Sequence, residues 1–489
     1  MSRLWLFLEK TEKIKRFFDK KVGLYLAMFA IIASNLVIYS VSNTHKFSAE
    51  QSRRDASAFS IYFAKKFIYF YYHTGYFPLG TINTDLVYTD KGAAQEIEKR
   101  GSDLIMEFYH WSRLGENTRI FAFLPNAWLD GGVEKPSIRL FNTIVFIFSL
   151  LCLCWGFGEI KKLLFGLLLI FCINTTPFYL FEVFTRENIF GILPATFYII
   201  LGLNLPILFN KKTSLYYKLM VPILSAFFIG FFSEIRNEIA VVLLSLLLIY
   251  ILTNNLGYKF KVLALVLVLF SFKSTKEYLR FYFKSKFAET TALVASKGGH
   301  VYHGSVIKGH MVWHPVFCGL GDFDTKYGYE WNDMVAFNYA MPILNNKYGL
   351  NLKYNGGYHL DQFYDDEKLY YVKFDEIPEY EPIVKAKVLA DIINDPLWYA
   401  DIIWKRIMRL LTRTLPYSYL GFLGIPLLFY LVEQKKWQWI KLLIISLPLS
   451  ATSIVIYSDR GTTYNSVFGY FILLIIIHEM YTFFETNQL

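Results

Sequence analysis

The stretch VGLYLAMFAIIASNLVIYSV, residues 22–41, decides the fold class of this chain. It contains no charged side chain. At 1.5 Å per helical residue, about 20 residues span the roughly 30 Å hydrocarbon core of a bilayer. The stretch therefore predicts a transmembrane helix. No small-residue cleavage site follows it, so we interpret it as a retained span and not as a signal peptide.

Similar apolar runs recur along the rest of the chain. Of its 489 residues, 54% are hydrophobic and only 18% are charged, whereas soluble proteins carry about 25% charged residues. The sequence therefore predicts an α-helical polytopic membrane protein with about ten transmembrane helices. The predicted spans are residues 22–41, 140–157, 163–174, 189–208, 219–232, 239–253, 262–272, 417–432, 442–457 and 467–480.

The basic residues of the short connecting segments fall on one face of this arrangement. Residues 1–21 and four turns carry seventeen Lys and Arg, whereas the short loops on the other face carry three. Because cytoplasmic loops are enriched in Lys and Arg, both termini are predicted to be cytoplasmic. The four basic turns are EIKK (159–162), NKKTSLYYK (210–218), GYKFK (257–261) and EQKKWQWIK (433–441).

Two long segments then fall on the extracytoplasmic face of a bacterial cytoplasmic membrane. The second of them ends in a stretch, 396–416, that resembles an interfacial helix. The expected organisation is a cytoplasmic interfacial helix (1–21), a first transmembrane helix (22–41), a first extracytoplasmic loop with an interfacial helix (42–139), transmembrane helices two to seven (140–272), a second extracytoplasmic domain (273–416) and C-terminal transmembrane helices (417–489).

The net charge of +10 does not indicate a nucleic-acid partner. The basic residues flank apolar runs and form no stripe with interleaved aromatic residues on a soluble domain, so membrane lipids are their expected partners. Three of the four cysteines, Cys152, Cys154 and Cys172, lie in apolar runs, and only Cys318 lies in a polar stretch. A disulfide framework is therefore not expected.

Each short extracytoplasmic turn combines an arginine with carboxylates at the membrane boundary. The turns are EVFTREN with Arg186, SEIRNE with Glu234 and Arg236, and SDRGTTY with Arg460. Arginine presents a rigid fork of donors that matches phosphate oxygens. Three such turns on one face indicate a shared anion-binding site, with Glu234 as a substrate contact. Helix-end salt bridges that secure each turn are the alternative.

The first extracytoplasmic loop supplies a candidate general base. In SRRDASAFSIYF (52–63), Asp55 begins an aromatic interfacial helix, and Arg54 lies beside it. That position holds a carboxylate just above the bilayer, where it could accept the proton of an acceptor hydroxyl. A helix N-cap without a chemical role is the alternative.

A stretch rich in histidine and glycine lies in the second extracytoplasmic domain. GHMVWHPVFCGLGDFD (309–324) contains His310, Trp313, His314, Asp322 and Asp324. Aromatic rings that pack on sugar C–H groups, with polar groups that bind hydroxyls, suit a saccharide. An ordered loop that packs on the first extracytoplasmic loop is the alternative. The stretch lacks the H-E-x-x-H motif of a zinc helix, so we assign no metal ligand, and a divalent ion as cofactor stays open.

This pattern resembles the GT-C superfamily of membrane glycosyltransferases, which use polyprenyl-phosphate-linked sugars. The resemblance covers nearly the whole chain as architecture. In that superfamily an acidic residue follows the first span, and Asp55 matches this position, although Ala56 follows where many members carry a second acid. The arginines that would bind the lipid phosphate are Arg54, Arg186, Arg236 and Arg460.

The resemblance implies an inverting direct displacement at the anomeric carbon of the sugar. Asp55 would take the proton of the attacking acceptor hydroxyl, and the arginines would stabilise charge on the leaving polyprenyl phosphate. The acceptor would be a glycan, a lipid or a protein. The stretch 297–324 would close over sugar and acceptor.

Three other functions stay open. A polysaccharide polymerase or ligase would use the same donor with a long-chain acceptor. A lipid or glycan transporter (flippase) predicts ionisable or helix-breaking residues at mid-membrane, and the Gly and Pro of FGILPATF (190–197) favour it. The charged residues, however, lie at the edges of the predicted spans. A receptor or scaffold would not need three arginine-bearing turns on one face.

Overall fold

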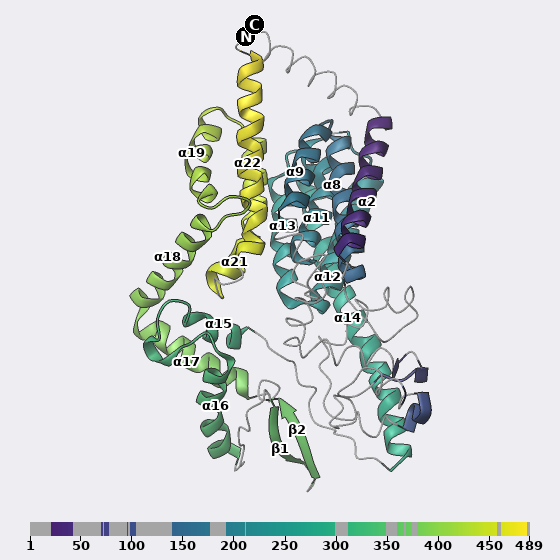
Figure 1. Ribbon diagram of the computed structural model, residues 1–489, viewed down its shortest axis with the longest axis vertical. Helices are drawn as coiled ribbons and strands as arrows, with labels where there is room; N and C mark the ends of the chain where they lie inside the picture. The colour runs from purple at the N-terminus through teal and green to yellow at the C-terminus, as the bar shows by residue number, and fades with distance from the viewer. Residues whose placement is uncertain are drawn as a thin grey trace.

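The computed structural model is mainly helical (Figure 1). It describes residues 21–42, 70–71, 73–77, 95, 98–103, 139–176, 192–210, 212–298, 312–348, 359–365, 368–373, 379–456 and 461–486. Within these ranges, every predicted span coincides with a helix or with two consecutive helices. The helices of this bundle are α2 (Lys21–Ser42), α8 (Arg139–Glu159), α9 (Leu163–Thr175), α11 (Ile192–Phe209), α12 (Leu215–Ile235), η5 (Asn237–Val241), α13 (Val242–Leu252), α14 (Tyr258–Ser296), α19 (Leu420–Glu433), α20 (Trp437–Ser446), α21 (Pro448–Val455) and α22 (Gly461–Thr486).

The length and hydropathy of these helices identify a multi-pass integral membrane protein. Among the described residues, five segments are long and apolar enough to cross a membrane. Four shorter apolar helices accompany them. The five segments are Lys21–Val41, Leu140–Glu159, Leu215–Ile235, Trp437–Val455 and Ser466–Phe483.

Two helices differ in extent from the predicted spans. The predicted span 262–272 is only the first part of α14, which continues without a break for 39 residues and extends past the end of the bundle (Figure 1). The segment predicted as the second extracytoplasmic domain (273–416) therefore begins inside a helix and not in a loop. The predicted span 442–457 is divided into α20 and α21, because Pro448 cannot donate a backbone hydrogen bond to the preceding turn.

A pair of glycines brings α8 and α11 into close contact. A Cβ atom on Gly202 would lie 2.3 Å from the backbone carbon of Cys152, and one on Gly156 would lie 2.2 Å from the Gly202 carbonyl oxygen. Small residues at such a crossing let two backbones approach in a membrane, where helix association depends on packing. These glycines therefore fix the distance between the two helices.

A buried hydrogen-bond network joins three helices inside the bundle. The Asn204 side chain on α11 donates to Ser225 Oγ on α12 at 2.9 Å, and Tyr250 on α13 donates to Asn204 Oδ1 at 2.6 Å. All three side chains are buried. Since an unsatisfied polar group is costly away from water, this network specifies which helix faces meet.

The contacts at one end of the bundle bring several basic turns together. Lys436, in the turn after α19, donates to Glu479 near the end of α22 at 2.8 Å. Lys162, in the turn before α9, lies over the ring of Trp439 at 4.4 Å. A Cβ atom on Gly158, at the end of α8, would lie 3.1 Å from a methyl carbon of Leu24, at the start of α2. The start of α2 and the end of α22 therefore lie at this end with the basic turns (Figure 1).

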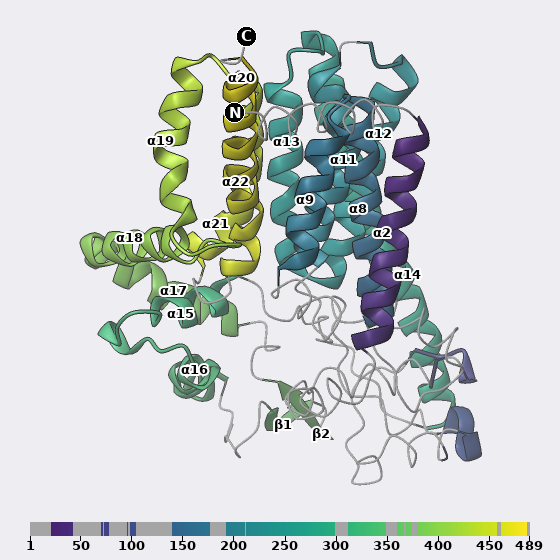
Figure 2. The ribbon, with the colours of Figure 1, turned by 45° about the horizontal axis from the view of Figure 1, so that its top comes forward.

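A second helical lobe lies at the opposite end of the bundle (Figures 1 and 2). It consists of α15 (Trp313–Leu320), η6 (Lys326–Gly328), α16 (Asp333–Tyr348), α17 (Tyr380–Asn394) and α18 (Pro396–Thr412). These elements have their own hydrophobic core, separate from that of the bundle. Its members are Val316, Phe317, Leu320, Tyr329, Ala336, Phe337, Ala340, Leu344, Tyr380, Val384, Val388, Trp398 and Ile402.

The structure adds an antiparallel hairpin that the sequence did not predict. Strand β1 (His359–Asp365) pairs with β2 (Lys368–Lys373), with His359 opposite Lys373 and Asp365 opposite Lys368. The predicted class of an α-helical membrane protein is unaffected, because the hairpin lies outside the predicted spans. The two strands have only seven and six residues, so the alternation of side chains that marks a strand is short and hard to recognise in the sequence.

Helix α18 connects the lobe to the bundle. Asp395 caps it, since its Oδ1 accepts from the Trp398 backbone N–H at 3.1 Å, and Pro396 begins it without losing a hydrogen bond. Its buried residues recur every four positions: Trp398, Ile402, Arg406 and Leu410. The helix runs at a steep angle to α19 and α22 (Figure 2). The helix covers most of the stretch 396–416, and its interfacial position stays a prediction.

Candidate functional site

Two charged pairs lie where α12 ends and η5 begins. Lys276 on α14 binds Glu234 with an Nζ–Oε1 distance of 2.9 Å, and Arg236 Nη2 donates to Glu238 Oε1 at 2.8 Å. The Glu234 side chain is 9% exposed and the Arg236 side chain is 13% exposed. Both predicted residues of this turn are therefore in ion pairs at the lobe end of the bundle. Glu234 and Arg236 each have a salt-bridge partner, as the alternative of helix-end salt bridges that secure the turn required.

Lys276 is a residue of this site that the sequence did not identify. The segment KSTKEYLR (273–280) directly follows the predicted span 262–272, and lysines at the end of a span are common, so they gave no sign of a site. The continuation of α14 carries Lys276 to the end of α12, where its ammonium group faces Glu234. The cluster therefore combines two cations and two carboxylates.

Five of the predicted site residues lie outside the described part of the chain. They are Arg54, Asp55, Arg186, His310 and Arg460. Arg460 falls between α21 and α22, and Arg186 falls between α9 and α11. The general base and three of the four proposed phosphate ligands therefore stay predictions.

A buried ion pair lies between the lobe and the bundle. Arg406 Nε donates to Asp322 Oδ2 at 3.0 Å, and the two side chains are 0% and 2% exposed. Arg406 also donates to the carbonyl oxygens of Ile454 and Val455 at 3.0 Å each and to that of Gly319 at 2.5 Å. Because its carboxylate is enclosed by protein, Asp322 has a structural role here. This burial disfavours the substrate contact that the sequence predicted for it.

Trp313 and Asp324 are also in contact with other parts of the lobe. The ammonium group of Lys385 lies 5.4 Å from the centroid of the partly buried Trp313 ring. Both carboxylate oxygens of Asp324 accept from the indole N–H of Trp398 at 3.3 Å. These contacts show the packing of an ordered segment, and the saccharide contacts of Trp313 and Asp324 stay predictions.

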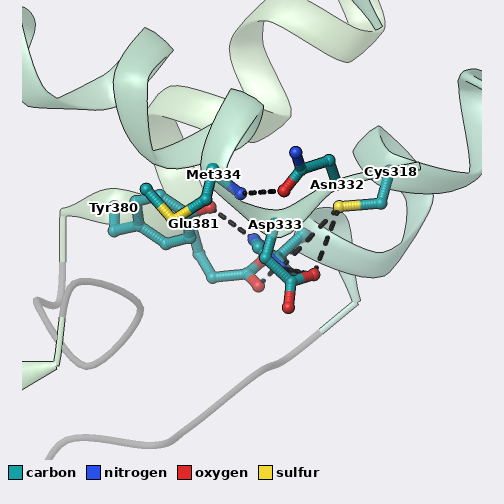
Figure 3. Close-up of polar contacts among 7 residues, drawn as sticks. Cys318, Asn332, Asp333, Met334, Tyr380 and Glu381 are labelled. Carbon is teal, nitrogen blue, oxygen red and sulfur yellow. Dashed lines mark hydrogen bonds and ion pairs between the residues drawn. The ribbon is translucent and has the colours of Figure 1, made fainter. Parts of the chain in front are cut away.

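His314 lies at the centre of a compact polar cluster. Its ring is buried, with Nδ1 2.5 Å from the Tyr380 hydroxyl and Nε2 3.1 Å from Asp333 Oδ1. The Sγ atom of Cys318 lies 3.8 Å from His314 Nε2 and 3.7 Å from Asp333 Oδ1. Figure 3 shows Cys318, Asp333 and Tyr380 gathered around this point. The burial of His314 was not expected for a ligand-binding loop.

A buried glutamate holds the helix that carries the cluster. Glu381 accepts from the backbone N–H groups of Trp313 at 3.0 Å and of His314 at 3.3 Å. These groups belong to the first turn of α15, where backbone N–H groups have no partner within the helix. A carboxylate at a helix N-terminus also interacts favourably with the helix dipole. Glu381 therefore fixes the position of the His314 ring.

The cluster does not have the geometry of a nucleophilic cysteine site. In such a site one imidazole nitrogen activates the thiol and the other binds an orienting acid. Here Cys318 and Asp333 both face Nε2, and Nδ1 faces Tyr380. Burial, followed by the charge of Asp333, raises the pKa of the Cys318 thiol. Convergence of a nitrogen, a sulfur and an oxygen is instead typical of metal ligands.

Sequence reasoning missed Cys318, Asp333, Tyr380, Glu381 and Arg406 as members of this region. One signal was present: Cys318 is the cysteine outside the apolar runs, and it lies four residues after His314. That spacing places two side chains on one face of a helix. No protein-family model, curated protein or solved structure gives a significant match to this chain.

Proposed function

We propose that this protein is a membrane glycosyltransferase that moves a sugar from a polyprenyl-phosphate carrier to an acceptor hydroxyl. The reaction would take place on the extracytoplasmic face of a bacterial cytoplasmic membrane. The arrangement of the chain supports this orientation, because the basic turns lie at one end of the bundle and the lobe lies at the other. A donor whose lipid tail stays in the bilayer would reach the lobe end from the side.

The observation that carries the proposal is the charged cluster at the lobe end of the bundle. Arg236 and Lys276 each lie beside a carboxylate and are 13% and 19% exposed. Neither pair is fully enclosed by protein, since the Lys276 and Glu238 side chains are 19% and 22% exposed, so a phosphate can approach the cations. A phosphate carries more charge than one carboxylate and could replace it on both cations. The cluster therefore supports a phosphate site at the membrane boundary.

In the proposed reaction the acceptor oxygen attacks the anomeric carbon while the bond from that carbon to the phosphate oxygen breaks. Asp55 receives the proton of the acceptor hydroxyl, and the configuration at the anomeric carbon inverts. Arg236, with Arg54, Arg186 and Arg460, stabilises the charge that develops on the leaving polyprenyl phosphate.

The distribution of buried charge gives no support to transport across the bundle. Among the described residues, the buried charged side chains are Glu234, Asp322, Glu381, Arg406 and Glu479. Glu234 and Glu479 lie near the ends of α12 and α22, and the other three belong to the lobe. A transport pathway would favour ionisable residues near mid-membrane.

The experiment that tests the proposal compares donor classes. Membranes that contain the protein would receive a radiolabelled sugar either on a polyprenyl phosphate or on a nucleotide. We expect label to reach an acceptor from the lipid-linked donor alone. One sugar added per acceptor indicates transfer, whereas a ladder of long products would indicate a polymerase. Movement of the intact lipid-linked sugar between leaflets, without a new glycosidic bond, would replace the proposal with a flippase.

A further inference from the structure

The junction of α15 and α16 brings three different metal-ligating side chains together. They are His314 and Cys318 on α15 and Asp333 at the start of α16. Within the part of the chain that the structure describes, this is the place where three such groups converge. We propose that the three side chains bind a zinc ion. The proposal is independent of the glycosyltransferase proposal, because none of these residues takes part in the phosphate site.

The distances among the three ligand atoms match a tetrahedral zinc site. Zinc binds at about 2.0–2.1 Å from nitrogen or oxygen and about 2.3 Å from sulfur, so tetrahedral angles require separations of about 3.3 Å for N–O, 3.6 Å for N–S and 3.5 Å for S–O. The observed separations are 3.1 Å, 3.8 Å and 3.7 Å. One ion can therefore bind all three atoms with shifts of a few tenths of an ångström.

Two neighbouring side chains hold the imidazole in the orientation that a metal ligand needs. When Nδ1 donates its hydrogen to the Tyr380 hydroxyl oxygen, the lone pair of Nε2 points at the proposed ion. The His314 ring also stacks on Phe337, with centroids 5.2 Å apart and planes at 24°. A fixed tautomer and a fixed ring lower the cost of ordering the ligand. Tyr380 is therefore a positioning residue for the ion.

The donor set selects the class of metal. Magnesium and calcium prefer oxygen ligands, whereas a set of nitrogen, sulfur and oxygen suits zinc. Cys318 would bind as the thiolate and release its proton to solvent when the ion enters. The Asp333 side chain is 43% exposed, while His314 is 3% exposed. A water molecule could therefore occupy the fourth position on the Asp333 side.

The test uses the full chain, purified in detergent with a streptavidin-binding tag and stripped with a chelator. It is equilibrated with Zn²⁺ alone, and bound metal is measured by mass spectrometry and by competition with a chromophoric chelator. We expect about one zinc ion per wild-type chain. Cys318→Ser and His314→Gln should weaken binding by more than about 100-fold, and Tyr380→Phe by about 10-fold. Cys172→Ser removes a thiol from the bundle and should leave the affinity unchanged.

A second measurement has a decisive arm that needs only the wild-type protein. Co²⁺ in place of zinc gives a thiolate-to-cobalt charge-transfer band in the near ultraviolet when a cysteine binds it. We expect this band in the wild type and in Cys172→Ser, and its loss in Cys318→Ser. Absence of the band from the wild type would overturn the proposal and leave a purely hydrogen-bonded cluster. Equal zinc affinity in wild type and a correctly folded Cys318→Ser would overturn it as well.

Discussion

Arg406 Nε lies 3.0 Å from Asp322 Oδ2, and both side chains are buried. The pair joins α18 to the segment after α15, which lies 84 positions earlier in the chain. The same guanidinium binds two carbonyl oxygens at the end of α21. One side chain therefore connects the lobe to the membrane bundle, and it stabilises the arrangement on which both proposed sites depend.

Loss of this guanidinium should destabilise the protein strongly. Arg406→Met leaves the Asp322 carboxylate buried without its charge partner, which typically costs about 3–5 kcal/mol. Lys405→Met is the control, because Lys405 pairs with Asp401 on the exposed side of the same helix and should contribute only about 0.2–1 kcal/mol. Thermal unfolding of the purified variants in detergent measures both. Equal midpoints for the two variants would contradict the structural role of Arg406.

The crossing of α8 and α11 should be intolerant of any side chain on Gly202. Gly202→Ser places new atoms against the Cys152 backbone, and overpacking of this kind costs about 1–3 kcal/mol. Gly257→Ser is the matched control, since no atom lies within 4 Å of its Cβ position and serine is a good N-cap for α14. A thermal shift as small in Gly202→Ser as in the control would refute the close crossing.

Acidification should weaken the start of α18. The pKa of Asp395 is lowered by its hydrogen bond from Lys326 and by the Trp398 N–H. The carboxylate therefore contributes stability above its ordinary pKa of 3.8, and this contribution is lost as the pH falls through the lower folded value. Asp395→Asn keeps an N-cap but has no charge. We expect hydrogen exchange in α18 to differ between wild type and variant at pH 7 and to converge in acid.

The two ends of the bundle should be accessible from opposite sides of the membrane. Lys405 in the lobe and Gln434 in the turn after α19 are exposed. A membrane-impermeant maleimide added to intact cells with a permeable outer envelope should label Lys405→Cys. It should label Gln434→Cys only after the membrane is opened. The reverse pattern would place the lobe in the cytoplasm and would remove access to an extracytoplasmic donor.

Local patterns predicted the bundle well and the site poorly. An apolar run must be buried in lipid or protein, so each predicted span fell on a helix. The continuation of α14 was missed because hydropathy falls at Lys273 although the residues that follow still favour a helix. Arg406 was missed because an arginine in an amphipathic helix normally belongs to the polar face. Its burial depends on Asp322, and no local pattern indicates a partner so far away in sequence.

The same limit applies to the His314 cluster. The sequence brought His314, Asp322 and Asp324 together as one ligand-binding surface, because they are neighbours in the chain. The fold separates them: His314 faces Asp333 and Tyr380, Asp322 faces Arg406, and Asp324 faces Trp398. These partners come from α16, α17 and α18, whose packing follows from their shared core. Tertiary contacts therefore decide the chemistry of this segment.

The measurement that tests the central claim most directly is sugar transfer by the purified protein in liposomes that contain a radiolabelled polyprenyl-phosphate sugar and an acceptor. Wild type would be compared with Asp55→Asn, Arg236→Ala and the control Arg280→Ala, whose exposed side chain pairs with Glu277 on the outer part of α14. Loss of a general base typically lowers the rate by about 10²–10⁴-fold. We expect such a loss in Asp55→Asn, a comparable loss in Arg236→Ala and an unchanged rate in Arg280→Ala. Transfer by Asp55→Asn and Arg236→Ala at the wild-type rate would contradict the account.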